Sequence, residues 1–185
     1  MNDIIVRNST VEDAGFAKEI SDEMMASAII RGSGISKRSP ESIVTKMKEG
    51  KAVIAVTSEN QWVGFSYIEV WANGEFVSNS GLIVAPEYRG EGVATRIKSQ
   101  VFELARRLFP EAKVFSITTG LAIMKMNAAL GFAPVTYSEI PKDPTFWKGC
   151  ESCVNYDILQ RKKCGNCLCT AMLFEPKEIK NTELV

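Results

Sequence analysis

The chain of 185 residues is long enough for one domain with a full hydrophobic core and too short for two ordinary ones. Its 22 basic and 22 acidic residues give a formal charge of zero, so net charge would not bring the whole molecule to nucleic acid or to an anionic membrane, and we expect neither partner. It contains no histidine, which excludes every histidine base, histidine triad and histidine metal ligand.

The N-terminal sequence predicts a cytoplasmic protein. No apolar run approaches the roughly 20 residues of a membrane-spanning helix. Residues 1–7 also lack the long apolar stretch of a signal peptide. We expect residues 1–174 to form a single domain and the polar residues 175–185 to form a C-terminal tail.

The hydrophobic pattern predicts strands and helices that alternate through the middle of the chain. In order, the expected elements are a strand at 2–8, a helix from Thr10 to about Ile30, a helix from Pro40 to Gly50, strands at 52–57, 62–71 and 82–85, a helix from Val93 to Leu108, a strand at 113–119, a helix at 121–130, extended chain at 132–140, and a last strand at 168–174. Residues 141–166 form an insertion, with a short helix around 156–161. This order requires an α/β (α+β) fold with a mixed sheet and helices on its faces.

A glycine-rich turn, Arg89-Gly90-Glu91-Gly92-Val93-Ala94, lies between an apolar strand and an amphipathic helix. Glycine adopts dihedral angles that a side chain forbids, and the first amides of a helix lack partners and attract anions. Strand, turn and helix together are typical of a phosphate or pyrophosphate site. The alternative is an ordinary connection in which the glycines only relieve crowding.

The same turn resembles the acetyl-CoA signature of the GNAT superfamily of N-acetyltransferases, Gln/Arg-x-x-Gly-x-Gly/Ala. The flanking segments 84–88 and 128–132, the second of which ends in Leu130-Gly131-Phe132, are also similar to that family. The resemblance implies the GNAT fold, with a mostly antiparallel sheet of about six to seven strands, and acetyl-CoA as cosubstrate. It does not decide whether the chain forms a homodimer.

The resemblance also implies which residues bind the coenzyme. The amides of the signature would hold the pyrophosphate, and a preceding strand would pair its backbone with the pantetheine arm. The residues concerned are Arg89, Gly90, Glu91, Gly92, Val93 and Ala94 in the turn, and Leu82, Ile83 and Val84 in the strand. A plain core strand is the alternative for the second set.

The catalytic residues are less conventional. Many GNAT enzymes protonate the departing thiolate with a tyrosine four residues before the Gly-Phe pair, where this chain has Asn127. An amide can orient the thioester but cannot act as an acid. Tyr67, Tyr137, Tyr156, a thiol or water would then supply the proton. The candidate base is Glu69, a carboxylate on an apolar strand face that must be paired, exposed or functional.

A basic segment, residues 31–38, falls where GNAT proteins shape the acceptor site. Its cations Arg31, Lys37 and Arg38 would suit a carboxylate-bearing acceptor, an amino acid such as glutamate. Thr118 and Thr119, at the end of a strand, would line the same pocket. The alternatives are a solvated loop for the first group and turn-forming residues for the second.

All five cysteines lie between residues 150 and 169. The pairs Cys150-x2-Cys153 and Cys164-x2-Cys167 have a spacing similar to that of zinc ribbons, and Cys169 is a spare ligand. This spacing predicts a structural zinc, with redox-sensitive thiols, buried cysteines or a specificity lid as alternatives. A ten-residue spacer spans about 33 Å when extended, so the chain must fold back for the four sulfurs to meet.

We therefore expect an acyltransferase that moves an acetyl group from acetyl-CoA to the primary amine of a small molecule. A protein N-acetyltransferase is the alternative within the class. A non-catalytic acyl-CoA-binding or zinc-stabilised interaction module is the alternative outside it.

Overall fold

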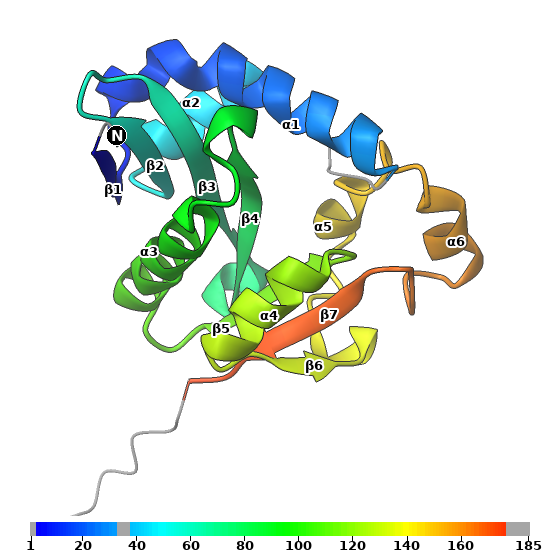
Figure 1. The fold of residues 1–185 in the computed structure, drawn as a ribbon. Helices are drawn as coiled ribbons and strands as arrows, with labels where there is room; N and C mark the ends of the chain where they lie inside the picture. The colour runs from blue at the N-terminus through cyan, green and yellow to red at the C-terminus, as the bar shows by residue number, and fades with distance from the viewer. Residues whose placement is uncertain (1–2, 33–37, 177–185) are drawn as a thin grey trace, which may run out of the picture.

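A computed structural model describes residues 3–32 and 38–176. Its seven strands form one mixed sheet in the order β1-β2-β3-β4-β5-β7-β6 (Figure 1). The strands are β1 (Ile4–Asn8), β2 (Ala52–Thr57), β3 (Trp62–Trp71), β4 (Phe76–Val84), β5 (Lys113–Thr118), β6 (Ala133–Val135) and β7 (Thr170–Phe174). Only β4 and β5 pair in parallel, because the helix between them carries the chain back across the sheet. The expected fold class and number of strands are confirmed.

Helices cover both faces of this sheet. They are α1 (Ala17–Arg31), α2 (Pro40–Lys48), α3 (Val93–Leu108), α4 (Leu121–Ala129), α5 (Pro144–Lys148) and α6 (Tyr156–Arg161). Helices α3 and α4 pack on one face, and α1 and α2 on the other. The two short helices α5 and α6 continue the α1–α2 face over β5 and β7, away from α3 (Figure 1).

Strand alternation divides the core between these faces. In β5, Val114 packs toward α3 and its neighbour Phe115 packs toward α5. On α3, the predicted stripe is buried at Val93, Ile97 and Val101, each at most 2% exposed. Burial of such side chains stabilises the fold by about 1.5–3 kcal/mol each, which fixes the helix that follows the glycine-rich turn.

The helix predicted from Thr10 consists of two elements. A 3-10 turn (Val11–Phe16) precedes α1, and Thr10 caps it as expected. The Thr10 amide donates to Asp13 Oδ2 at 2.8 Å, and Arg7 donates to both Asp13 oxygens at 2.7 and 2.8 Å. The buried carboxylate of Asp13 thus connects β1, through Arg7, to the first helical turn, through the Thr10 amide.

The chain beyond α4 differs from the prediction in three places. The extended run expected over 132–140 is wrong after Val135, because Thr136 and Glu139 form a capping box that starts a 3-10 turn (Tyr137–Glu139). The last strand starts at Thr170 rather than 168. Helix α6 lies where a short helix was expected, whereas α5 was not predicted.

Strand β4 begins six residues before the predicted strand at 82–85. The sequence pattern missed its first part because that part carries polar residues and a glycine. Two further 3-10 turns, Ala72–Gly74 and Pro86–Tyr88, flank β4. Among the helices within 3–32 and 38–176, none has the length and apolar character needed to cross a membrane.

Candidate active site

The parallel strands β4 and β5 separate soon after they pair. They are hydrogen-bonded only from Phe76 to Ser78 and from Lys113 to Phe115. Beyond these residues β4 remains paired with β3 as far as Val84, and β5 with β7 as far as Thr118, so the edges that face each other are left without a strand partner. The result is a gap within the sheet, hereafter the β4–β5 gap, that could take an extended ligand by backbone pairing.

A β-bulge in β4 marks one wall of this gap. The β3–β4 register changes between Phe65 and Tyr67, which pair with Ile83 and Ser80, so two residues of β4 oppose one of β3. One of them, Gly81, has φ +64, and a Cβ there would lie 2.9 Å from Cδ1 of Tyr67. Only glycine satisfies both restrictions, a signal that the sequence pattern did not reveal.

A cavity of about 460 Å³ opens from the gap. The residues around it come from α1, β3, β4, β5, α3, α4, the segment from Tyr137 to Cys169, and Arg38. Of the predicted site residues, those that line the cavity are Arg31, Arg38, Glu69, Leu82, Thr118, Thr119, Cys150, Cys153 and Cys167. Lys37 lies outside the described residues.

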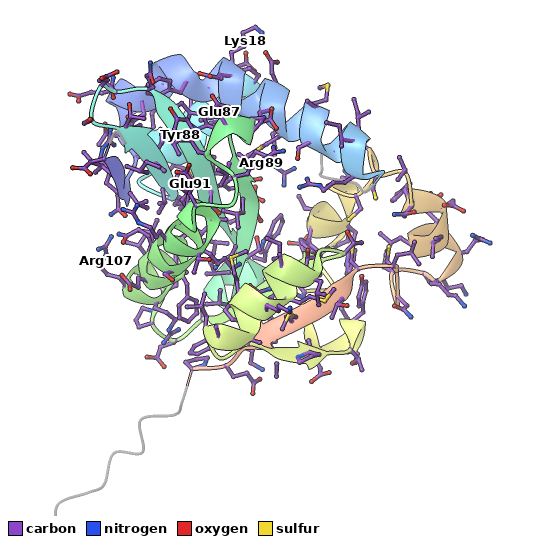
Figure 2. All side chains as sticks on the ribbon, viewed as in Figure 1. Lys18, Glu87, Tyr88, Arg89, Glu91 and Arg107 are labelled. Atoms are coloured by element: carbon purple, nitrogen blue, oxygen red, sulfur yellow. The ribbon has the colours of Figure 1, made fainter. Side chains whose placement is uncertain are left out.

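The glycine-rich turn lies between the end of β4 and the start of α3, where Figure 2 shows Arg89 and Glu91. Gly90 and Gly92 have φ +86 and +77, and a Cβ on either would meet nothing within 4 Å. The glycines are therefore required by their dihedral angles and not by crowding. Within the described part of the chain, no group accepts a hydrogen bond from the backbone amides of residues 90–95.

The Arg89 side chain is bonded to two other parts of the protein. Its Nε donates to the carbonyl oxygen of Val84 at 3.0 Å, and its Nη2 pairs with Glu23 of α1 at 2.5 Å. These contacts tie the turn to both β4 and α1. The Arg89 amide also donates to the carbonyl oxygen of Pro86, at 3.3 Å, so the free amides of the turn begin at Gly90.

A charged cluster lies on the α1–α2 side of the cavity. The buried hydroxyl of Tyr67 accepts a hydrogen bond from Arg38 Nε. The carboxylate of Glu69 lies 3.7 Å from Arg38 Nη2 and 3.3 Å from Lys46 Nζ. Burial raises the pKa of Tyr67 to about 12, although Arg38 opposes the shift, so this hydroxyl stays protonated at neutral pH.

The comparisons agree with this geometry. The sequence profile of the acetyltransferase (GNAT) family matches residues 19–130, a segment that contains the turn, the β4–β5 gap, most of helix α1 and helices α2 to α4. The chain belongs to the GNAT acetyltransferase family. A search of curated proteins gave no significant match.

Solved structures confirm the fold. N-acetylglutamate synthase from Neisseria gonorrhoeae, complexed with coenzyme A and N-acetyl-glutamate, superposes with a TM-score of 0.66 at 16% identity over 95% of this chain, which spans 36% of that protein. Rv2747 from Mycobacterium tuberculosis, in complex with CoA, gives 0.64 at 17% identity over 92% of this chain and 98% of that one. A phosphinothricin acetyltransferase from Sinorhizobium meliloti, in complex with acetyl-CoA, superposes with a TM-score of 0.59 at 16% identity, over 98% of this chain and 97% of that one.

Membership in the GNAT family makes the chain an acyltransferase. The three solved structures named above carry coenzyme A or acetyl-CoA. The position of the usual tyrosine acid is filled by Asn127, which is 0% exposed and does not line the cavity. Its Nδ2 donates to Met172 Sδ at 3.6 Å, while its Oδ1 has no hydrogen-bond partner among the described residues. Asn127 thus packs α4 against β7, and its predicted catalytic role stays untested.

Two buried polar residues that the sequence analysis passed over lie at the gap of this GNAT protein. Asn79 of β4 is 9% exposed, and Lys98 of α3 is 3% exposed. Both line the cavity. A lysine directly after Ile97, at the border of the apolar stripe of α3, was the one signal that could have indicated this position.

The other predicted acceptor residues have mixed surroundings. Thr118 Oγ1 accepts a hydrogen bond from the Gly120 amide at 3.0 Å, so it shapes the turn into α4 and also lines the cavity. Arg31, at the end of α1, has a lowered pKa because it is partly buried and lies near Arg89. An anion bound in the cavity would relieve both effects.

The cysteine segment folds back over the cavity but does not form the expected metal centre. Within residues 3–32 and 38–176 there is no group of three or more Cys, Asp or Glu side chains that could hold a metal ion. The structure therefore gives no support to zinc at Cys150, Cys153, Cys164 and Cys167. Burial and neighbouring thiols raise the pKa of Cys150 to about 11, so this thiol is protonated at neutral pH.

Proposed function

We propose that this chain transfers the acetyl group of acetyl-CoA to the primary amine of a small acceptor that carries a carboxylate, an amino acid such as glutamate. The observation that supports this most directly is the pair of guanidinium groups, Arg31 and Arg38, in a cavity continuous with the β4–β5 gap. Arginine binds carboxylates through two parallel hydrogen bonds, which fixes the orientation of the acceptor.

In this proposal the coenzyme crosses the molecule from the turn to the cavity. Its pyrophosphate accepts hydrogen bonds from the free amides of the turn at residues 90–94, where the α3 dipole favours negative charge. Its pantetheine arm then pairs with the open edge of β4 along residues 82–84. The thioester consequently reaches the cavity between Ser80 and Ser116, which both line it.

The acceptor lies on the α1–α2 side of the gap. Tyr67 and Glu69 hold Arg38 in place, and the carboxylate of Glu69 forms part of the cavity wall. Glu69 takes the proton of the acceptor ammonium directly or through water, after which the neutral amine attacks the thioester carbonyl in a ternary complex.

The insertion favours a small acceptor over a protein substrate. Phe146, Trp147 and Tyr156 of α5 and α6 line the cavity and cover it on the side of the acceptor. A lysine or N-terminus presented by another protein would need an open groove at this place. The Neisseria relative crystallised with N-acetyl-glutamate agrees with an amino-acid acceptor.

The experiment is a measurement of coenzyme A release, by chromatography, with a panel of amino acids and with amines that lack the α-carboxylate. Glutamate and 4-aminobutyrate form the sharpest pair, because both keep a carboxylate but only glutamate has one next to its amine. We expect turnover with one or more α-amino acids and little or none with the matched amines. Turnover with simple amines alone would contradict the proposal.

A further inference from the structure

Lys98 is a buried cation that the fold itself does not require. Its side chain comes from the middle of α3, is 3% exposed and lines the cavity. No described residue forms an ion pair or a hydrogen bond with its ammonium group, which lies 5.6 Å from the centre of the Phe132 ring. Burial of an unpaired charge is costly, so a functional partner is expected when the site is occupied.

Asn79 is an independent indication of a ligand at the same place. Its Nδ2 and Oδ1 are both buried without a hydrogen-bond partner in the described structure, although the side chain lines the cavity. By strand alternation Asn79 points to the same sheet face as Val77, which packs with α3. The α3 side of the gap thus presents an ammonium and a carboxamide that both lack partners.

The position of Lys98 along α3 corresponds to the reacting end of the coenzyme. Helix α3 runs antiparallel to β4, because it connects two parallel strands. Six residues from Gly92 to Lys98 rise about 9 Å along the helix axis. The four residues of β4 from Val84 to Ser80 span about 13 Å in the same direction. The two levels differ by about 4 Å, which is shorter than a lysine side chain.

We infer that Lys98 is the acid of this acetyltransferase, donating the proton that the coenzyme A thiolate takes up as it leaves. The inference rests on the coenzyme site proposed above. It gives the reaction two sides: the amine enters from the α1–α2 face, and the thiolate is protonated from the α3 face. Lys98 thereby fills the role that Asn127 cannot perform.

The thiolate is protonated as the tetrahedral intermediate collapses. The acceptor nitrogen forms a bond to the thioester carbon, and the carbonyl electron pair moves to oxygen. When this intermediate collapses, the C–S bond breaks and its electron pair leaves on sulfur. A proton of the Lys98 ammonium then moves to sulfur to give free coenzyme A. The attacking nitrogen, which is positively charged once the C–N bond has formed, loses its extra proton to solvent, and neutral Lys98 regains a proton from solvent.

The protonation state of Lys98 suits this transfer. Burial lowers the pKa of its ammonium group to about 8, which keeps it mostly charged at neutral pH. The ordinary pKa of a thiol, about 8.5, is close to this value, so the proton can move with little free-energy change.

The test compares the binding of coenzyme A and of desulfo-coenzyme A, which lacks only the thiol, by calorimetry at pH 8. The wild type is expected to bind coenzyme A about tenfold more tightly, because a charge-assisted bond to sulfur contributes about that factor. In Lys98→Met, a variant that places an apolar side chain in an apolar environment, the ratio falls to about 1. The control is Arg107→Met, which removes a positive charge from the exposed end of the same helix (Figure 2).

Catalysis provides the second measurement. With the best acceptor, kcat of Lys98→Met is expected to fall by about 10²- to 10⁴-fold. The wild type should lose rate at high pH as Lys98 loses its proton, and this loss should be absent from the variant. A coenzyme-to-desulfo ratio that Lys98→Met leaves unchanged, or a ratio of one in the wild type, overturns the inference. If the wild type binds neither nucleotide, the coenzyme site itself is wrong and the inference falls with it.

Discussion

The backbone of Gly81 lies directly against the ring of Tyr67. A Cβ at Gly81 would approach Cδ1 of this ring to 2.9 Å and Cε of Met24 to 3.0 Å. Tyr67 cannot move away, because it is 1% exposed and its hydroxyl is bonded to Arg38. The Tyr67 ring therefore contacts the β4 bulge on one side and Arg38 on the other, so the positions of the bulge and of Arg38 depend on each other.

The first prediction concerns this contact. Gly81→Ala combines a left-handed φ of +64 with a collision inside the core, and we expect it to lower the free energy of unfolding by about 2–4 kcal/mol. Gly50→Ala is the matched control, since Gly50 has φ +66 but nothing within 4 Å of its added Cβ, and it should cost about 1 kcal/mol. Urea unfolding gives both values. Equal losses would show that the Tyr67 contact is unimportant.

The second prediction concerns the phosphate turn. Gly92→Leu places a side chain over the amides that would hold the pyrophosphate, and it should weaken coenzyme A binding at least about 100-fold, the order of two or three lost charge-assisted hydrogen bonds. Gly50→Leu has a similar positive φ and equally open surroundings. It should lose comparable stability while the coenzyme is bound as in the wild type. Calorimetric binding to both variants separates the two effects.

The third prediction concerns the acceptor. Arg31→Gln removes one guanidinium from the cavity wall, and the KM for a carboxylate-bearing acceptor should rise about 10- to 100-fold, with a smaller effect on kcat. Lys18→Gln, on the outer surface of α1 (Figure 2), is the control for removal of a charge from the same helix. A KM that changes no more than in this control would exclude Arg31 from acceptor binding.

The sequence contained enough information for the coenzyme end of the site, because one short turn holds most of it. Two glycines before an amphipathic helix predict both the positive φ values and the unpaired amides that the structure shows at Gly90 and Gly92. The helix stripe was also predicted correctly, except that Leu108 at its end is 44% exposed.

The reacting end of the site depends on tertiary structure, and the sequence pattern could not predict it. Strand β4 carries polar residues at Asn79 and Ser80, beyond its last pair with β5 at Ser78, where its edge faces a cavity rather than a neighbouring strand. The alternation that identifies strands is therefore lost. Lys98 appears in the sequence as an ordinary polar helix residue, and only the fold shows that it is buried. The zinc predicted from the cysteine spacing finds no support in the described residues, and spacing alone does not determine where sulfurs point.

The fourth prediction concerns the carboxylate that starts the helical layer. Asp13 is 3% exposed, and although burial opposes it, the bonds from Arg7 and the Thr10 amide lower its pKa below the ordinary 3.8. Its contribution to stability is therefore complete above about pH 4 and is lost as the pH falls through the folded-state pKa. Asp13→Asn should cost about 2 kcal/mol at pH 7 and progressively less below pH 4. A cost that does not depend on pH would show that the charge is unimportant.

The last prediction is that Lys98 is kept at the expense of stability. Its pKa is lowered by burial from 10.5 to about 8, so between these values the unfolded chain binds a proton that the folded chain has lost. The free energy of unfolding must then rise with pH over this interval, by about 3 kcal/mol if Lys98 acted alone. Below pH 8 the full cost of the buried charge is present.

Lys98→Met removes this cost and should be more stable than the wild type by about 2 kcal/mol at pH 7, a difference that shrinks as the pH rises toward 10. Urea unfolding of both proteins over this range isolates Lys98, because the cysteines and tyrosines titrate in both. Arg107→Met should follow the wild type throughout. A stabilised variant that has lost the acid step would explain why an apolar helix face retains a lysine, since coenzyme chemistry needs the charge that folding disfavours. A variant less stable than the wild type would mean that Lys98 has a structural partner.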